Sequence, residues 1–463
     1  MDNNKKQPVE KNKEYIVEII DNGFEGEGIA KIENFTIFIP NSIKGEKVRI
    51  LILKVLSSHA FGKIIEIINP SPYRIKSDCS TYKRCGGCNL RHIKYEETLK
   101  MKQNAVQSLV NKTLQNKIKV QYTVGMENPF HYRNKAQYPF GINNDGEPVI
   151  GVFANRTHEV IPVEKCLIQN SQSEAIAKFV LEFIKRNKIS IYDEKTGNGL
   201  FRHIVIKVGI QTGQIMCILV VNGKSIPKEK ELVEALSIKF PQIKTIVKNI
   251  NMKNTNVILG QENINIYGDG YIEDRLGDYT FKISPLSFYQ VNPVQAEKLY
   301  NLGVEMAQIS KEDVVFDLYC GIGTISLFMA KYAKKVYGIE IVKEAVEAAR
   351  ENAILNGVTN TEFFAGDVEI VLDELINKQG VKADIVMIDP PRKGLDRNSI
   401  NNILMIKPKK IVYISCNPAT LVRDLAEFED WYEVGNIVPV DMFPFTSHVE
   451  CVALMGRKED KSR

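Results

Sequence analysis

The sequence predicts a multidomain protein with an N-terminal OB-like β-barrel, a central α+β domain and a C-terminal α/β sheet of the Rossmann-like type. Three observations predict this fold class. The chain has 463 residues, which is more than one compact core usually holds. Short alternating strands without a helical pattern occupy its beginning, and strands that alternate regularly with helices occupy its end. The expected division is a disordered tail at 1–13, the barrel at 14–68, the central domain at 69–285 and the sheet at 286–463.

The composition is that of an ordinary globular protein, with 44% hydrophobic and 25% charged residues. Apolar runs such as 215–221 are far shorter than the roughly 20 residues that cross a bilayer, and the polar start lacks the apolar segment of a secretory signal. We therefore expect a cytoplasmic protein with no membrane contact and no obligate protein partner. In a reducing compartment, its eight cysteines indicate metal binding, catalysis or simple burial rather than disulfides.

Positive charge is concentrated in one segment, although the net charge of the chain is only +5. Residues 70–120 contain eleven Lys and Arg residues but only three Asp and Glu residues. Such a basic block suits a polyanion such as nucleic acid. A lysine-rich surface that is merely solvated explains it equally well.

The barrel is predicted from short strands separated by turn residues such as Asn22-Gly23 and Lys44-Gly45. Apolar and polar residues alternate along these strands, and nothing between them has helical periodicity. Barrels of this kind often bind RNA and often serve only as scaffolds, so both roles stay open. The five strands are expected at 15–20, 26–32, 35–40, 46–55 and 62–68.

The central domain is expected to contain a helix at 95–114 and strands at 203–209 and 214–221. After it, apolar strands alternate with helical segments, which is typical of a parallel, doubly wound sheet. The last two apolar runs have no helix between them and therefore predict an antiparallel pair at the edge. The strands of this sheet are expected at 314–321, 335–341, 361–367, 383–391, 410–416, 434–442 and 448–456.

A glycine turn follows the first strand of this sheet. Gly321 and Gly323 let the backbone approach a ligand closely, at the crevice where open α/β sheets bind nucleotides. Ser326 stands where the dinucleotide fingerprint has its third glycine, so the turn does not match a pyrophosphate site. Acids end the next three strands: Glu340, Asp367 and Asp389. The first of them can accept hydrogen bonds from ribose hydroxyls, so the pattern favours S-adenosylmethionine over NAD, with another nucleotide as the alternative.

Cys416 lies at the carboxyl end of the fifth strand, just before a helix. The positive end of the helix dipole favours the thiolate, a soft nucleophile, whereas a buried and inert thiol is the alternative. A thiolate beside a methyl donor suits methylation of uracil, because addition of sulfur to C6 gives C5 the electrons to attack the methyl group. A base must then remove the C5 proton. Glu450 and His448 open the last strand, and we favour Glu450 as that base.

Six short motifs follow one another in the C-terminal region. They are FYQVN (288–292), DLYCGIGT (317–324), GIE (338–340), DPPRKG (389–394), SCNPATLVRD (415–424) and SHVE (447–450). In this order they resemble the motifs of the RNA uracil-C5-methyltransferase family. The resemblance implies that Cys416 is the nucleophile and Glu450 the base. It also implies contacts to S-adenosylmethionine, for which the candidates are Gln290, Tyr319, Gly321, Thr324, Glu340, Asp367 and Asp389.

Four of the cysteines are spaced like metal ligands. Cys79, Cys85 and Cys88 lie close together, and Cys166 follows 78 residues after the third. Four thiolates suit zinc or an iron–sulfur cluster, and their spacing alone does not separate the two. The resemblance implies a [4Fe–4S] cluster, because family members with this spacing carry one and begin with a small barrel called TRAM. Since methyl transfer needs no electron, we expect a structural or RNA-binding cluster.

The resemblance also implies an RNA substrate, and the TRAM barrel together with the cluster favours 23S ribosomal RNA over the T-loop uridine of tRNA. It implies further that part of the region after the cysteine triplet can pack on the catalytic domain. Segments 132–135 and 201–203 resemble parts of the family's RNA cleft, with ordinary surface structure as an equal reading. Two other classes stay open: an amino-methyltransferase that uses Asp389-Pro390-Pro391, and a non-catalytic RNA-binding protein.

Overall fold

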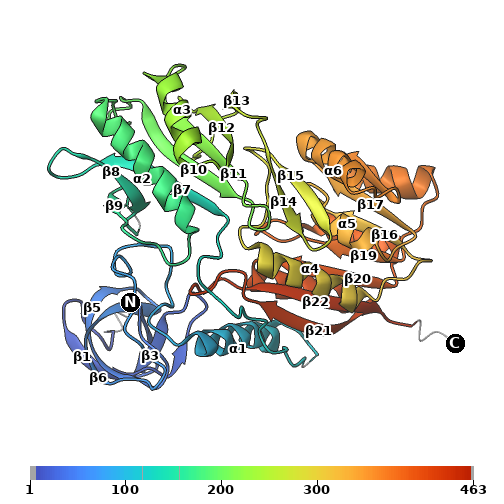
Figure 1. The fold of residues 1–463 in the computed structure, drawn as a ribbon. Coiled ribbons are helices and arrows are strands. Elements are labelled where there is room, and N and C mark those ends of the chain that lie inside the picture. Colours follow the sequence, from blue (N-terminus) through green and yellow to red (C-terminus); the bar gives the residue numbers. More distant parts are fainter. Residues whose placement is uncertain (1–6, 117, 156, 460–463) are drawn as a thin grey trace, which may run out of the picture.

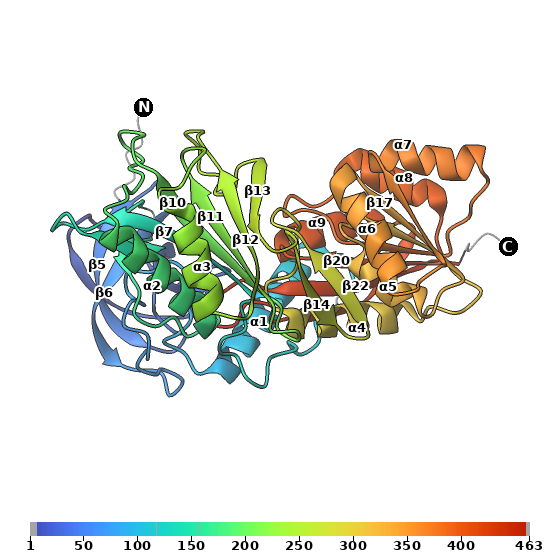
Figure 2. The ribbon, with the colours of Figure 1, turned by 45° about the horizontal axis from the view of Figure 1, so that its top comes forward.

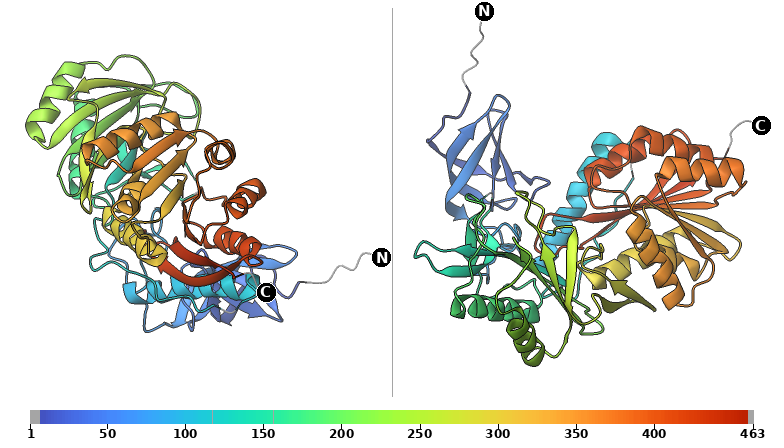
Figure 3. Two further views of the ribbon diagram at one scale, coloured as in Figure 1. Left: turned by 90° about the vertical axis from the view of Figure 1, so that its right-hand side faces the viewer. Right: turned by 90° about the horizontal axis from the view of Figure 1, so that it is seen from above.

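The computed structural model describes residues 7–116, 118–155 and 157–459, whose fold is shown in Figure 1. Three large β-sheets follow one another along this part of the chain, and a two-stranded hairpin lies between the second and the third. Figure 3 shows them from two further sides, with the barrel in blue, the central sheet in green and the C-terminal sheet in orange and red. The expected tail at 1–13 lies partly outside the described residues.

The N-terminal barrel consists of strands in the order β1-β5-β6-β4-β3-β2. Ile37, Ile50 and Ala60 are fully buried in its core. Register irregularities between β5 and β6 let these two long strands bend around that core. A short strand, β2, includes Asn22, where a turn was expected, because the residue pairs with β3. The bounds are β1 Glu14–Glu18, β2 Asp21–Asn22, β3 Gly28–Ile32, β4 Phe35–Ile39, β5 Lys47–Val55 and β6 His59–Asn69.

The central sheet has the order β13-β12-β11-β10-β7-β8-β9. Helices α2 and α3 cover one face through an apolar core. On the other face, Val205, Met216 and Ile218 share a continuous core with the hairpin β14–β15 and with the C-terminal sheet. One core therefore joins the central and C-terminal sheets through the hairpin that lies between them. The bounds are β7 Lys135–Ile142, β8 Pro148–Phe153, β9 Val160–Pro162, α2 Ser171–Arg186, β10 Phe201–Val208, β11 Ile215–Val221, α3 Glu229–Lys239, β12 Ile243–Ile250, β13 Glu262–Tyr267, β14 Ile272–Leu276 and β15 Tyr279–Ile283.

The C-terminal sheet has the order β18-β17-β16-β19-β20-β22-β21. The first five strands in this order run parallel, whereas β22 and β21 are antiparallel to their neighbours, as the sequence predicts. The order reverses beside β16, and a crevice at the carboxyl ends of the strands is expected there. The bounds are β16 Val314–Leu318, β17 Lys335–Glu340, β18 Thr361–Ala365, β19 Ile385–Ile388, β20 Lys410–Ser415, β21 Tyr432–Val440 and β22 Glu450–Arg457.

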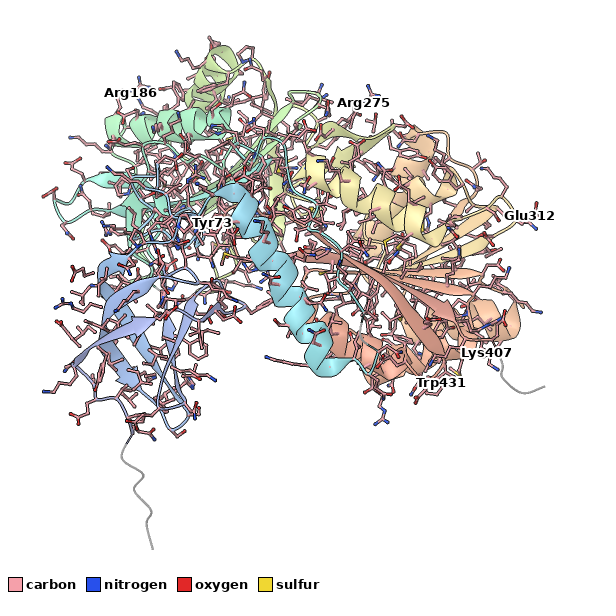
Figure 4. The ribbon with its side chains drawn as sticks, turned by 90° about the horizontal axis from the view of Figure 1, so that it is seen from below. Tyr73, Arg186, Arg275, Glu312, Lys407 and Trp431 are labelled. Atoms are coloured by element: carbon pink, nitrogen blue, oxygen red, sulfur yellow. The ribbon has the colours of Figure 1, made fainter. Side chains whose placement is uncertain are left out.

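Helices cover both faces of the C-terminal sheet (Figure 2). Helices α4 to α6 pack on one face, and α7 to α9 pack on the other together with α1, which comes from a much earlier part of the chain. Figure 4 shows α1 in cyan, running from the barrel side toward the C-terminal sheet. None of the helices in the described residues combines the length and the apolar character needed to cross a membrane. The bounds are α1 Tyr95–Thr113, α4 Pro293–Ala307, α5 Thr324–Ala330, α6 Lys343–Leu355, α7 Val368–Asp373, α8 Arg397–Ile406 and α9 Pro418–Phe428, with a π-helical turn at Glu374–Lys378.

Candidate active site

A cavity of about 1740 Å³ opens at the carboxyl ends of the parallel strands of the C-terminal sheet. The loop between β15 and α4 and parts of the central sheet's last loops close its other side. The cavity brings together both predicted catalytic residues, Cys416 and Glu450. It is also lined by all the predicted methyl-donor contacts: Gln290, Tyr319, Gly321, Thr324, Glu340, Asp367 and Asp389.

The two glycines of the turn after β16 have different roles. Both have a positive φ, 54° at Gly321 and 80° at Gly323, which disfavours any residue with a Cβ. A Cβ on Gly321 would meet no atom within 4 Å, and this residue lines the cavity. A Cβ on Gly323 would lie 3.1 Å from the side chains of Ala349 and Phe363. Of the two glycines that were expected to face a ligand, only Gly321 lines the cavity, whereas Gly323 permits close helix packing.

The carboxylates at the rim are held by backbone amides. Glu340 accepts hydrogen bonds from the amides of Gly321, at 3.2 Å, and of Val342, at 3.0 Å. Asp367 does not end a strand, as the sequence predicted, because β18 stops at Ala365. Instead it caps helix α7, and its Oδ1 accepts from the amide of Glu369 at 2.9 Å. The side chain still lines the cavity from this position.

Cys416 and Glu450 face each other because of the strand register. Cys416 directly follows β20, and Glu450 is the first residue of β22. The two strands are antiparallel, with Ser415 opposite Cys451, so the next step along the register brings Cys416 opposite Glu450. Helix α9 begins just beyond the cysteine. A thiol and a carboxyl group thus share one edge of the cavity.

The pKa values of three acidic groups in the cavity are raised, contrary to the expected stabilisation of a thiolate. Burial and the charges of Glu450 and Asp389 raise the pKa of Cys416 to about 11, although Arg392 opposes the shift. Burial, followed by the charge of Asp389, raises the pKa of Glu450 to about 8. Burial also raises the pKa of Asp389 to about 7. The helix N-terminus therefore does not make Cys416 a thiolate by itself, and the site as a whole disfavours added negative charge.

Tyr300 and Arg392 are among the cavity residues that were not predicted as site residues. Tyr300 on α4 is buried and lines the cavity, and its pKa is raised by burial and by the charge of Asp389. Arg392 lies close enough to lower the pKa of both Cys416 and Glu450. The basic residue after Asp389-Pro390-Pro391 could have revealed Arg392, whereas nothing in the local sequence distinguishes Tyr300 from a core tyrosine. His448, the alternative base, also lines the cavity, and burial and the charge of Arg392 lower its pKa.

The two segments expected at an RNA cleft are largely buried. Tyr132 is buried and donates a hydrogen bond from its hydroxyl to the carbonyl of Pro444 at 3.2 Å. Arg202 is also buried, and its guanidinium donates to the carbonyls of Asn251 and Lys253. These contacts give both side chains a structural role, which favours that role over contact with RNA.

The chain matches known proteins over almost its whole length. The model of the tRNA (uracil-5-)-methyltransferase family matches residues 94–458, and that of the TRAM domain matches residues 8–65. The chain belongs to this methyltransferase family. An uncharacterized RNA methyltransferase of Clostridium acetobutylicum is 47% identical, and the match covers 97% of this chain and 98% of the relative. An uncharacterized RNA methyltransferase of Caldanaerobacter subterraneus is 46% identical, and the match covers 96% of this chain and 98% of the relative. Among solved structures, the tRNA (uracil-54, C5)-methyltransferase of Pyrococcus abyssi, in complex with S-adenosyl-L-homocysteine, is 25% identical, with a TM-score of 0.75 over 96% of this chain and 100% of that one.

The four cysteines of the methyltransferase lie near one another. Cys88 and Cys166 border one small apolar cluster, and Cys85 pairs through its backbone with Ala154. Burial and the nearby Cys166 raise the pKa of Cys88 to about 12. However, no three His, Cys, Asp or Glu side chains within 7–116, 118–155 and 157–459 are arranged as a metal-binding group. The donor chemistry therefore suits a thiolate-bound metal, whereas the side-chain arrangement does not form a closed site.

Proposed function

We propose that this RNA uracil-5-methyltransferase methylates C5 of a specific uridine in 23S ribosomal RNA through a covalent bond between Cys416 and uracil C6. The observation that carries the proposal is the pairing of β20 with β22, which brings a thiol and a buried carboxyl group to one edge of a large cavity. A thiol nucleophile fits a reaction at C5, because this carbon is a poor nucleophile until sulfur has added to C6. An amino-methyltransferase needs neither group.

The methyl donor is proposed to be S-adenosylmethionine. The Pyrococcus enzyme binds S-adenosyl-L-homocysteine, which is what this donor becomes after losing its methyl group. Acidic side chains outnumber basic ones along the cavity, which suits a sulfonium cation. We assign the ribose hydroxyls to Glu340 and the remaining contacts to Gln290, Tyr319, Gly321, Thr324, Asp367 and Asp389.

The proposed reaction conserves atoms and charge. Cys416 releases its thiol proton to solvent and bonds to C6, and the electrons of the C5–C6 bond then take the methyl group from the sulfonium. Glu450 as a carboxylate removes the C5 proton, and the Cys416–C6 bond breaks to restore the double bond. The products are 5-methyluridine and S-adenosyl-L-homocysteine. Arg392 supports this sequence, because its charge lowers the pKa of Cys416 and of Glu450.

Two RNA targets have support. The TRAM barrel and the four cysteines favour 23S ribosomal RNA, through the family resemblance. The likeness of nearly the whole chain to the Pyrococcus tRNA (uracil-54, C5)-methyltransferase favours a tRNA uridine as the second candidate. We further propose that Cys79, Cys85, Cys88 and Cys166 hold a [4Fe–4S] cluster and that the chain divides at about residues 68 and 285. Such a cluster would hold the basic segment 70–120 to the strand near Cys166.

Methylation of both RNAs by the purified protein tests the proposal. Deproteinised 23S ribosomal RNA and tRNA that lack 5-methyluridine are incubated separately with S-adenosylmethionine, and their nucleosides are analysed by mass spectrometry. The proposal predicts 5-methyluridine in the ribosomal RNA and none with Cys416→Ala. 5-Methyluridine in tRNA alone would identify the second candidate. A methyl group on nitrogen or on a ribose oxygen would refute the uracil-C5 mechanism.

A further inference from the structure

The segment 441–449, which joins β21 to β22, forms one wall of the cavity. Phe443 and His448 on this segment line the cavity, as does Glu450 directly after it. Phe445, at the middle of the segment, has a left-handed backbone with a φ of 65°. This conformation is costly for a bulky side chain and persists only where surrounding contacts impose it. The shape of this wall therefore depends on what holds the segment.

One set of contacts comes from the residues directly after Cys88. The amides of Asn89 and Leu90 donate hydrogen bonds to the carbonyl of Phe445, at 3.1 Å and 2.9 Å. The amide of Ser447 donates to Asn89 Oδ1 at 2.8 Å. In addition, the buried Arg91 guanidinium lies 4.3 Å from the ring centroid of Phe445. These contacts hold Phe445 in its left-handed conformation through both its backbone carbonyl and its aromatic ring.

A second set comes from helix α1. The Lys102 ammonium forms an ion pair with Asp441 Oδ1 at 2.5 Å, and both side chains are almost completely buried, with 2% and 0% of their surface exposed. The hydroxyl of Tyr95 donates to the other carboxylate oxygen of Asp441 at 2.8 Å. Lys102 also donates to the carbonyl of Phe443 at 3.3 Å. Helix α1 thus holds the beginning of the segment, at the place where the cavity wall starts.

We propose that Asn89 and Lys102 are positioning residues, which hold segment 441–449 so that Glu450 and the adjoining wall stand correctly toward Cys416. Neither side chain lines the cavity, and both come from the part of the chain before the central sheet. The inference rests on the proposed function, because it gives these residues a role in the uridine reaction. It also gives the region around Cys88 a role other than contact with RNA, because this region would hold segment 441–449 in place.

Asn89→Ala and Lys102→Met test the proposal in the full-length protein. Lys248→Met is the matched control, because the buried Lys248 forms an ion pair with the partly exposed Glu229, at 2.8 Å, away from the cavity. We expect kcat to fall at least tenfold in both test variants, while the KM values for S-adenosylmethionine and RNA change less than threefold. Amide hydrogen exchange in 441–449 should rise in the same two variants. The control should keep both properties within twofold.

A double variant separates positioning from misfolding. Lys102→Met alone leaves the Asp441 carboxylate buried without its cation, which can prevent folding. Adding Asp441→Asn removes that charge, and the amide oxygen can still accept from Tyr95, so we expect the double variant to fold. Because this variant still lacks the contacts of Lys102 with the segment, we expect its kcat to stay at least tenfold below that of the wild type, and full recovery of kcat would overturn the role of Lys102. Unchanged kcat and exchange in Asn89→Ala, or an equal loss in Lys248→Met, would overturn the inference. If the wild type forms no 5-methyluridine, the proposed function fails, and the exchange of 441–449 alone decides the inference.

Discussion

Burial raises the pKa values of three acidic groups of the cavity, namely Cys416, Glu450 and Asp389. The pKa of Cys416 is raised to about 11 by burial and by the charges of Glu450 and Asp389, so the unliganded protein holds a thiol at neutral pH. A cation bound nearby would shift all these groups toward their charged forms. We therefore expect binding of the cationic methyl donor to favour the Cys416 thiolate, whereas the less reactive thiol prevails when no donor is bound.

Glu450→Gln should stop the reaction after methyl transfer. Without a base the C5 proton stays in place, so the Cys416–C6 bond cannot break. We expect turnover to fall by at least about 100-fold and a protein–RNA adduct to accumulate with ordinary uridine RNA. Denaturing electrophoresis with labelled RNA measures the adduct. Full turnover by this variant would exclude Glu450 as the base.

The same substitution predicts a change in the pH dependence of stability. The pKa of Glu450 is raised by burial to about 8 in the fold from 4.5, so the fold favours its protonated form. That stabilisation is present below pH 4.5 and is lost as the pH rises through 8. The free energy of unfolding of Glu450→Gln, relative to that of the wild type, should therefore increase by about 2–4 kcal/mol between pH 5 and pH 8.5. Urea unfolding at several pH values measures this difference. If the free energies of unfolding of the variant and the wild type change equally with pH, the prediction is wrong.

The two turn glycines should respond differently to alanine. Gly321→Ala strains the backbone by about 1 kcal/mol and puts a methyl group where we place the donor, so affinity for S-adenosylmethionine should fall at least tenfold with little loss of stability. Gly323→Ala also pushes against Ala349 and Phe363, so it should cost more stability, about 2–3 kcal/mol. Thermal unfolding and calorimetric titration measure the two effects. The reverse ranking would show that their roles are exchanged.

At the level of elements, a buried ion pair joins the barrel to the segment that carries Cys79, Cys85 and Cys88. Glu46, just before β5, is completely buried and accepts two hydrogen bonds from the guanidinium of Arg74, at 2.5 Å and 2.7 Å. Burial alone would raise the pKa of Glu46, but the contact with Arg74 and two backbone amides lower it overall. The stability that this carboxylate provides is therefore present at neutral pH and is lost in acid.

Glu46→Gln should destabilise the protein by about 2–4 kcal/mol at pH 7, because it leaves the Arg74 charge without its partner. The difference from the wild type should shrink as the pH falls from 4.5 toward the lowered pKa of the native carboxylate. Glu66→Gln is a suitable control, since its ion pair with Arg49 is exposed. A loss of stability that is the same at pH 4 and pH 7 would contradict the assigned role.

Elements with local signals were predictable, and those that depend on packing were not. The acids and Cys416 come together because carboxyl ends of parallel strands meet at one edge, so the strand pattern alone indicated the site. Asp367 was misplaced at a strand end because the end of β18 depends on pairing with β17. Burial and two neighbouring carboxyl groups, which no local sequence reveals, reverse the expected shift of the Cys416 pKa. The same holds for the wall at 441–449, whose contacts come from residues more than 300 positions away.

At the scale of the whole molecule, one continuous core joins the central sheet to the catalytic sheet. The cavity lies where the two meet, and residues from the last loops of the central sheet, such as Val257 and Tyr271, form part of its wall. An extruded base would therefore enter between two bodies that are packed together rather than hinged by a linker. The TRAM barrel lies at the other end of the segment that carries Cys79, Cys85 and Cys88.

Trapping with 5-fluorouridine RNA tests the central claim most directly. Fluorine at C5 cannot leave as a proton does, so the bond between Cys416 and C6 should persist after methyl transfer. The protein is incubated with S-adenosylmethionine and the fluorinated RNA, and the adduct is digested and analysed by peptide mass spectrometry. We predict one modified peptide, which carries a methylated fluorouridine on Cys416. Methylation without any adduct, or a nucleotide attached to another residue, would contradict the account.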